Sequence, residues 1–422
     1  MNQKRHFWVT VTLFNLCLVA LYGFTLRAKF LFPIAFVNYR DFLSAHSHFA
    51  FGGWVGLSLM VLFVYGLLPE HRRHHGAYQG VLAAVELTAL GMAITFPFQG
   101  YAAPSFTFST LFLMAAFIFC GMFARDILRS GQPGPVILLA LSSLTCFVLS
   151  TLGTLGITYV LLSRVPDSLL YRDSLYTFLH FQYNGFFTLG VFAVLAARVY
   201  GTLTVSQQKN LGRFAWLLSL SVPPTLFLSL LWHPHQPLFR LFALVGSLLM
   251  LGALYLFLHL ARWLLQPRDS SDPLARKMLT LSMGAFVLKI LLQLGMLHPG
   301  LAHAIFGNRP AIIGFLHLVF LGLVTFFILS MYIDWGELDR RRTLAGAGLL
   351  VFSAGILLNE IILMVQGLGI LFQSASFIYP WLLWGASAVL LAGSLLVAWG
   401  RFQAGAKKQD GNPGGGPGSP SC

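Results

Sequence analysis

The residues best suited to chemistry in this sequence are its histidines. Neutral imidazole is a good ligand for haem iron, copper and zinc. Eight of the thirteen histidines lie toward the same end of long apolar segments, and these are His46, His48, His180, His233, His235, His298, His303 and His317. A buried ionisable group in an apolar environment normally has a partner or a function. We therefore expect metal or haem ligands in this group.

Three of these histidines begin the same short pattern, in which a glycine follows five residues after the histidine. The pattern occupies residues 48–53, 180–185 and 317–322. The segments are almost evenly spaced, and each interval contains four predicted helices. This regularity predicts a pseudo-threefold arrangement of four-helix units. A glycine below a histidine lets a flat macrocycle or a neighbouring helix approach the backbone closely.

The histidines could form two sites. A haem between two helices needs one axial histidine from each. His48 or His46 could supply one and His317 the other, with His48 favoured because it belongs to the repeat. His46 is expected to ligate a second haem or to hold a haem propionate. Three further histidines could bind copper or non-haem iron: His180, His233 and His235. The alternative for His46 and His48 is that they cap the start of their helix. The alternatives for the others are ordinary hydrogen bonding for His180 and exposure in a turn for His233 and His235.

Long apolar helices must position these residues. The chain has 422 residues, and 57% are hydrophobic while only 9% are charged, which excludes a soluble enzyme, a disordered protein and a nucleic-acid-binding domain. About 20 apolar residues cross a bilayer as a helix. Twelve segments qualify: 7–26, 44–67, 77–97, 105–124, 135–162, 174–199, 213–232, 238–265, 277–297, 310–333, 343–366 and 379–400. The sequence thus predicts an all-α, twelve-helix membrane domain over residues 1–402 and a disordered cytoplasmic tail over 403–422.

Positive charge indicates the orientation. Most of the 27 Lys and Arg residues lie near the chain ends and in loops after even-numbered helices, so both termini are expected in the cytoplasm. The net charge of +14 then reflects topology and attraction to anionic lipid, and we expect no nucleic-acid partner.

Buried charges provide further candidates. Glu86, Lys289 and Glu360 lie deep in predicted helices and could belong to a proton path or form structural pairs. Among the arginines on the histidine-rich side, Arg40 and Arg309 are the expected partners of haem propionates.

The whole pattern resembles the superfamily of heme-copper oxidase subunit I and the nitric oxide reductase large subunit. The similarity is carried by residues 45–54, by His180 with Gly185, and by His233 and His235 around Pro234. The family has a His-x-His pair on helix ten, whereas this chain has only His317 there and its His-x-His on helix two. The resemblance therefore implies a divergent member with one bis-histidine haem.

Several functions follow from this resemblance. It implies a membrane haem protein with haem b, and with copper or non-haem iron as a possible second metal, in respiratory electron transfer or in oxygen or nitric oxide chemistry. An oxidoreductase activity is left open. The implied location is a bacterial inner membrane, with lipid, haem and a periplasmic cytochrome or other electron donor as partners. The alternatives are a twelve-helix transporter and a non-catalytic accessory subunit of a membrane complex.

Overall fold

The protein is an all-helical integral membrane protein. The computed structural model describes residues 3–410 except 74, 164–166, 234–235, 267–271, 306, 339–342 and 372–375, and the described part contains no strand. Twelve helical spans are long and apolar enough to cross a bilayer. The predicted fold class and number of spans are therefore confirmed.

Eight spans are single helices, and four combine an α-helix with π- or 3-10-helical segments. In chain order the helices are α1 (Gln3–Lys29), α2 (Tyr39–Phe49), η1 (Ala50–Gly56), α3 (Leu57–Leu67), α4 (Glu70–Arg73), α5 (Gly76–Gln99), α6 (Ala103–Leu128), α7 (Gly134–Ser163), α8 (Ser168–His180), η2 (Phe181–Phe187), α9 (Thr188–Val199), η3 (Tyr200–Thr202), α10 (Val205–Thr225), η4 (Leu226–Leu230), α11 (Pro237–Leu264), α12 (Pro273–Gly295), α13 (Pro299–Ile305), α14 (Arg309–His317), η5 (Leu318–Thr325), α15 (Phe326–Asp334), α16 (Thr343–Leu371) and α17 (Ile378–Asp410).

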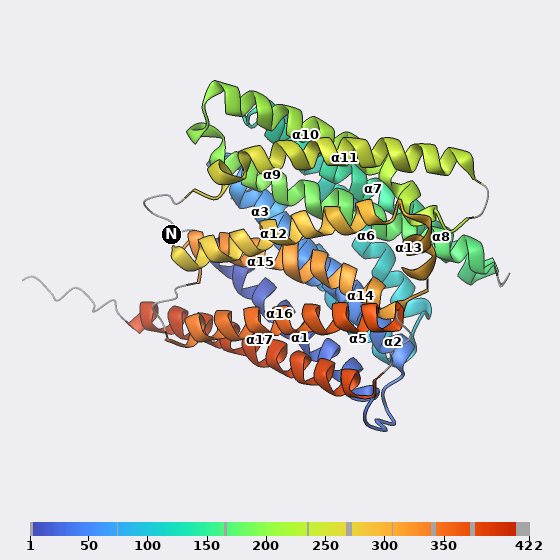
Figure 1. Cartoon of the computed structure of the whole chain (residues 1–422). Coiled ribbons are helices and arrows are strands. Elements are labelled where there is room, and N and C mark those ends of the chain that lie inside the picture. Colours follow the sequence, from blue (N-terminus) through green and yellow to red (C-terminus); the bar gives the residue numbers. More distant parts are fainter. Residues whose placement is uncertain are drawn as a thin grey trace, which may run out of the picture.

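The spans lie side by side in one bundle (Figure 1). The pair α10 and α11 forms one edge, the pair α16 and α17 forms the opposite edge, and α3, α9 and α15 lie between them. The start of α1 and the end of α17 lie at the same end of the bundle, which we call the terminal face. The opposite end, where α2, α8 and α14 begin, is called the distal face.

Several spans begin earlier than their apolar cores suggest. The second span starts at Tyr39 and the sixth at Ser168, so His46, His48 and His180 lie well inside their helices. The side chain of Asn38 caps α2 and that of Asp167 caps α8, each by accepting hydrogen bonds from backbone N–H groups. The last helix continues to Asp410, into the segment predicted as a tail, and residues 411–422 lie outside the described part.

A π-helical segment directly follows the repeated histidine in three spans. η1 begins two residues after His48, while η2 and η5 begin immediately after His180 and His317. π-Helical turns are rare and are found mostly at functional sites. The three segments meet through Phe51, Phe187 and Phe320, whose ring centroids are 4.5 to 6.1 Å apart.

Each π-helical segment receives a hydrogen bond from the span that precedes it in the chain. Asn15 Nδ2 donates to the carbonyl of Gly53 at 2.7 Å. Ser143 Oγ donates to that of Phe186 at 2.6 Å, and Ser282 Oγ donates to that of Leu323 at 2.6 Å. A π-helical turn disturbs the regular backbone ladder, and a membrane interior supplies no water to satisfy the freed carbonyls. The three side chains supply the missing donors, in the first, fifth and ninth spans.

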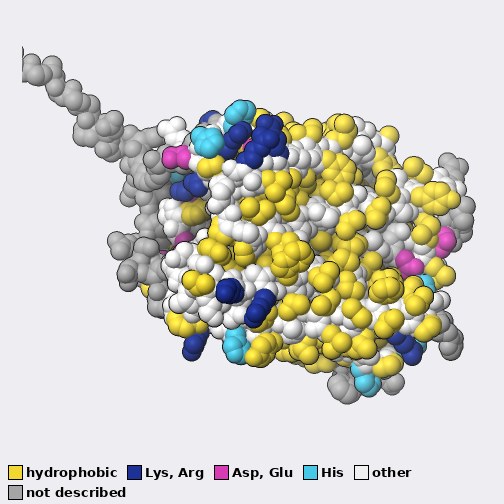
Figure 2. Space-filling view, turned by 90° about the horizontal axis from the view of Figure 1, so that it is seen from above, with side chains coloured by type: hydrophobic (Ala, Val, Ile, Leu, Met, Phe, Trp, Pro, Cys, Tyr) yellow, Lys and Arg dark blue, Asp and Glu magenta, His cyan; other side chains and the backbone are white. Residues whose placement is uncertain are grey.

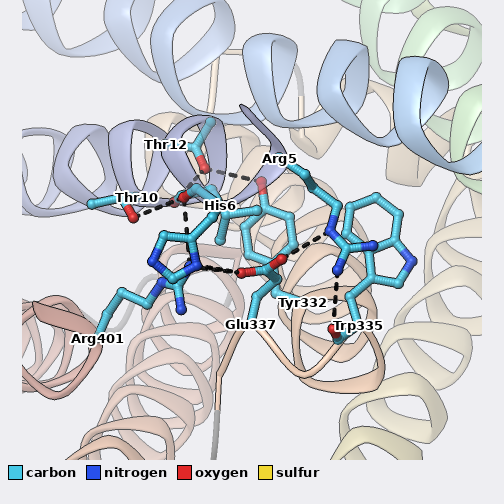
Figure 3. Close-up of polar contacts among 9 residues, drawn as sticks. Arg5, His6, Thr10, Thr12, Tyr332, Trp335, Glu337 and Arg401 are labelled. Atoms are coloured by element: carbon cyan, nitrogen blue, oxygen red, sulfur yellow. Dashed lines mark hydrogen bonds and ion pairs between the residues drawn. The ribbon is translucent and has the colours of Figure 1, made fainter. Parts of the chain in front are cut away.

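A buried ionic cluster closes the terminal face (Figure 3). The carboxylate of Glu337 accepts from Arg5 Nε at 2.8 Å and from Arg401 Nη2 at 2.6 Å, and it lies 3.2 Å from His6 Nδ1. The guanidinium group of Arg5 also lies over the ring of Trp335, 5.0 Å from its centroid. The cluster joins the beginning of α1, the segment after α15 and the end of α17.

The surface agrees with a bilayer environment. Figure 2 shows hydrophobic side chains over the middle of the visible face, with charged side chains toward its two ends. Large apolar side chains on several spans are widely exposed, among them Phe98, Leu155 and Leu248. Such continuous apolar exposure would favour aggregation in water and is stable in lipid.

Candidate functional site

His46 faces the first span. Its Nδ1 atom lies 3.2 Å from the carbonyl oxygen of Val19 in α1. A side-chain Cβ at Gly23 would approach the imidazole Cε1 to 3.3 Å, so the glycine allows the ring to lie against α1. The imidazole is therefore held between two spans rather than at the helix start.

His317 lies on the tenth span close to His46. Its Nδ1 atom is 2.9 Å from the carbonyl oxygen of Ile313, one turn earlier in α14. It interacts electrostatically with His46 and with Arg27 of α1, and Arg27 in turn interacts with Glu360 of α16. Four ionisable groups from the first, second, tenth and eleventh spans thus gather on the distal side of the bundle, and we call them the distal cluster.

In both imidazoles of the distal cluster, the same ring nitrogen, Nε2, has no partner among the described residues. In both rings Nδ1 is bonded to a backbone carbonyl, and Nε2 makes no hydrogen bond to the described residues. Both side chains are partly exposed, so each borders space that protein atoms do not fill. A histidine that ligates a metal commonly donates one ring N–H to a carbonyl and binds the metal through the other nitrogen.

His48 points to a different neighbour. Its ring stacks on Phe96 of α5 with centroids 4.5 Å apart, and it meets Tyr101 edge-on at 6.0 Å. Its Nδ1 atom lies 2.9 Å from the carbonyl of Ser44. A spacing of two residues places His46 and His48 on different faces of α2, and the geometry favours His46 as the partner of His317.

His180 has both ring nitrogens engaged. Its Nε2 lies 2.8 Å from the carbonyl oxygen of Val222, and its Nδ1 lies 3.1 Å from Asn184 Nδ2. Where α10 passes into the 3-10 segment η4, the backbone N–H of Leu226 bonds the carbonyls of Pro223 and Pro224 instead of that of Val222. The Val222 carbonyl accepts from Thr225 Oγ1 at 3.1 Å, and its contact with His180 ties the sixth span to the seventh.

The remaining predicted ligands do not form a metal centre within the described residues. His233 Nε2 lies 3.0 Å from the carboxylate of Asp173, and its ring packs on Trp232. His235 lies outside the described residues. In the part of the chain that the structure describes, no group of three or more His, Cys, Asp or Glu side chains could hold a metal ion.

The other buried charges have local partners. Lys289 Nζ donates to Gln293 Oε1 at 3.0 Å within α12, and Glu86 Oε2 accepts from Asn15 Nδ2 at 2.7 Å. Glu360 Oε1 accepts from the neighbouring Asn359 at 3.0 Å. Glu360 alone of the three belongs to the distal cluster.

Sequence reasoning missed two features of the site. It did not single out Arg27, which interacts electrostatically with His317, and the arginines that it proposed as partners of haem propionates, Arg40 and Arg309, are both exposed. It also missed Asn15, Ser143 and Ser282 as donors to the π-helical segments. The signal for Arg27 was its place at the end of an apolar run, at the level of the histidines.

The chain was compared with known proteins. No protein-family model matches the sequence, and no curated protein is significantly similar to it. The assignment of function therefore depends on the site itself.

Proposed function

We propose that this protein is a membrane haem protein in which His46 and His317 are the axial ligands of one haem b. The observation that carries the proposal is the pair of imidazoles from the second and tenth spans. His46 and Arg27 interact electrostatically with His317, the Nδ1 atom of each imidazole bonds a backbone carbonyl, and neither Nε2 atom bonds a described residue. Two imidazoles, one from each of two spans, are the ligand set of a low-spin haem.

The other members of the distal cluster fit the same cofactor. Arg27 would pair with a haem propionate, since a guanidinium group binds carboxylates with two parallel hydrogen bonds. Gly23 makes room for the His46 ring against α1. The carbonyls of Val19 and Ile313 would hold the two imidazoles in the tautomer that leaves Nε2 available. When bound, the haem would supply reversible one-electron transfer.

The recurrence of the π-helical segments supports the pseudo-threefold arrangement that the resemblance to the heme-copper oxidase and nitric oxide reductase superfamily implies. Three spans carry a histidine followed by such a segment, and the span before each one donates to it. We infer that these spans occupy equivalent places in a pseudo-threefold arrangement. The charge distribution further supports cytoplasmic termini. The resemblance adds a bacterial inner membrane as the location, with a periplasmic cytochrome or another electron donor acting on the distal side.

Electron transfer is the role that these residues favour. Reduction of oxygen or nitric oxide would need a second metal with an open position. His180, which was the main candidate ligand for that metal, uses both ring nitrogens in hydrogen bonds. We therefore propose an electron carrier, or a haem-containing subunit of a larger complex, ahead of a gas reductase.

The test is a reduced-minus-oxidised visible spectrum of the purified protein in detergent, with an iron and copper count on the same sample. We expect a sharp b-type α-band and one iron per chain. The variants His46→Ala and His317→Ala should each abolish the band. The matched control is His48→Ala, which removes an imidazole from the same helix and should leave the band unchanged.

The outcomes separate the alternatives. If His48→Ala loses the band and His46→Ala keeps it, the protein binds haem through His48 and not through His46. A wild-type protein without iron, produced in cells supplied with haem, would overturn the proposal. Transport assays would then be the next experiment.

A further inference from the structure

A large apolar cavity lies next to the distal cluster, on the other side of the tenth span. Its volume is about 440 Å³, within the range of small-molecule sites. Its walls come from the sixth, seventh, ninth, tenth and eleventh spans and from α13. The tenth span separates the cavity from His317, because Phe315 and Leu318 line the cavity and His317 does not.

The cavity reaches the lipid-facing surface. On α12 its lining includes Leu291 and Leu292, which are 53% and 43% exposed. On α16 it includes Met364 and Leu368, with similar exposure. These four side chains belong both to the cavity wall and to the apolar surface of the bundle. A molecule dissolved in the distal half of the bilayer could therefore enter between α12 and α16.

The chemistry of the wall restricts the ligand. The few polar side chains among the apolar ones are Tyr176, Tyr183, Ser229, Gln293 and Glu360, together with the indole of Trp232. No lysine, arginine or histidine is among the described residues that line it, and Lys289 lies behind Gln293, to which it donates. A carboxylate or phosphate buried there would contact no opposite charge directly, and burial of an unpaired anion is costly.

We propose that this cavity binds a neutral amphiphile taken from the bilayer, with an apolar body and a head that carries one or two hydroxyl or carbonyl oxygens. The apolar walls bind the body. The amide N–H of Gln293 or the protonated carboxyl of Glu360 donates a hydrogen bond to an oxygen of the head. The proposal does not depend on the haem. Binding can fail while the haem spectrum is present, and the reverse is equally possible.

The probe is tritiated decyl-1,4-benzoquinone, a neutral molecule with two carbonyl oxygens, and its saturable binding is measured on the full-length protein in lipid nanodiscs. We expect saturation at one molecule per chain. Sodium decanoate, which has a tail of the same length and a charged head, should compete at least about 10-fold more weakly, as expected for an unpaired buried charge.

Two variants locate the site. Leu292→Trp should narrow the opening and weaken binding about 10-fold or more, whereas Leu281→Trp should bind as the wild type does. Both leucines lie on α12 with about 40% exposure, and only Leu292 lines the cavity. Glu360→Leu removes a hydrogen bond to the head and should cost about 10-fold, while Glu360→Gln keeps one and should stay within about threefold.

Three results would overturn the proposal. The first is no saturable binding to the wild type. The second is equal binding to the Leu292→Trp and Leu281→Trp proteins, which would place the probe elsewhere. The third is equal competition by decanoate, which would show that the cavity takes any alkyl chain.

Discussion

Asn15 offers the sharpest test of how the buried backbone is satisfied. Its Nδ2 donates to the carbonyl of Gly53 in η1 and to Glu86 Oε2, both at 2.7 Å, and the side chain is fully buried. In Asn15→Leu both acceptors lose this donor within an environment without water. Side-chain hydrogen bonds between membrane helices contribute about 0.6 kcal/mol on average, and an unsatisfied buried group costs about 1–3 kcal/mol. We expect a loss of roughly 2–3 kcal/mol in the free energy of unfolding.

The assay is unfolding in mixed micelles of dodecyl maltoside and sodium dodecyl sulfate, followed by far-ultraviolet circular dichroism. Asn15→Ala separates the loss of the hydrogen bonds from any strain caused by the leucine. A double-mutant cycle with Glu86→Leu isolates one of the two bonds, because the second change removes that acceptor. We expect a coupling free energy of about 1 kcal/mol. Wild-type stability of Asn15→Leu, or strict additivity in the cycle, would refute the reasoning.

Three more predictions follow from the same geometry. Ser143→Ala and Ser282→Ala each remove one donor to a π-helical segment and should each cost about 1 kcal/mol in the same unfolding assay; no change in either would show that those carbonyls need no donor. His180→Phe should lower the unfolding free energy by about 1–3 kcal/mol and leave any haem spectrum intact, whereas a spectral change would identify His180 as a ligand. Gly23→Val would push a side chain into the imidazole of His46, and we expect a shifted or weakened haem band measured against Gly23→Ala, which adds less volume.

The number of spans was predictable because each one contains a long apolar run. The residues at which helices begin on the distal face were not predictable. In the sixth span, for example, the first turns contain Arg172 and Asp173, which lower the local hydropathy although the chain is already helical. Hydropathy detects the bilayer core, whereas caps such as Asn38 and Asp167 determine where the helix begins.

The candidate site was predictable in part. The histidine spacing pointed to the second and tenth spans, and in the structure His46 of the one interacts electrostatically with His317 of the other. The repeat pattern favoured His48, because a pattern along the chain carries no information about which face of a helix meets which neighbour. The repeated histidine and glycine marked where the π-helical segments lie, but not that they are π-helical. Donors such as Ser143 could not be recognised, because they are distant in the chain and resemble ordinary polar residues.

The cluster around Glu337 has a consequence for biogenesis. Arg5 and His6 are synthesised first, Glu337 follows after ten spans, and Arg401 arrives only with the last span. The carboxylate therefore acquires its most buried partner only after α17 has been inserted and packed. A chain that stops before Arg401 leaves Glu337 short of positive charge at the terminal face, which a quality-control protease could recognise as an unfinished product.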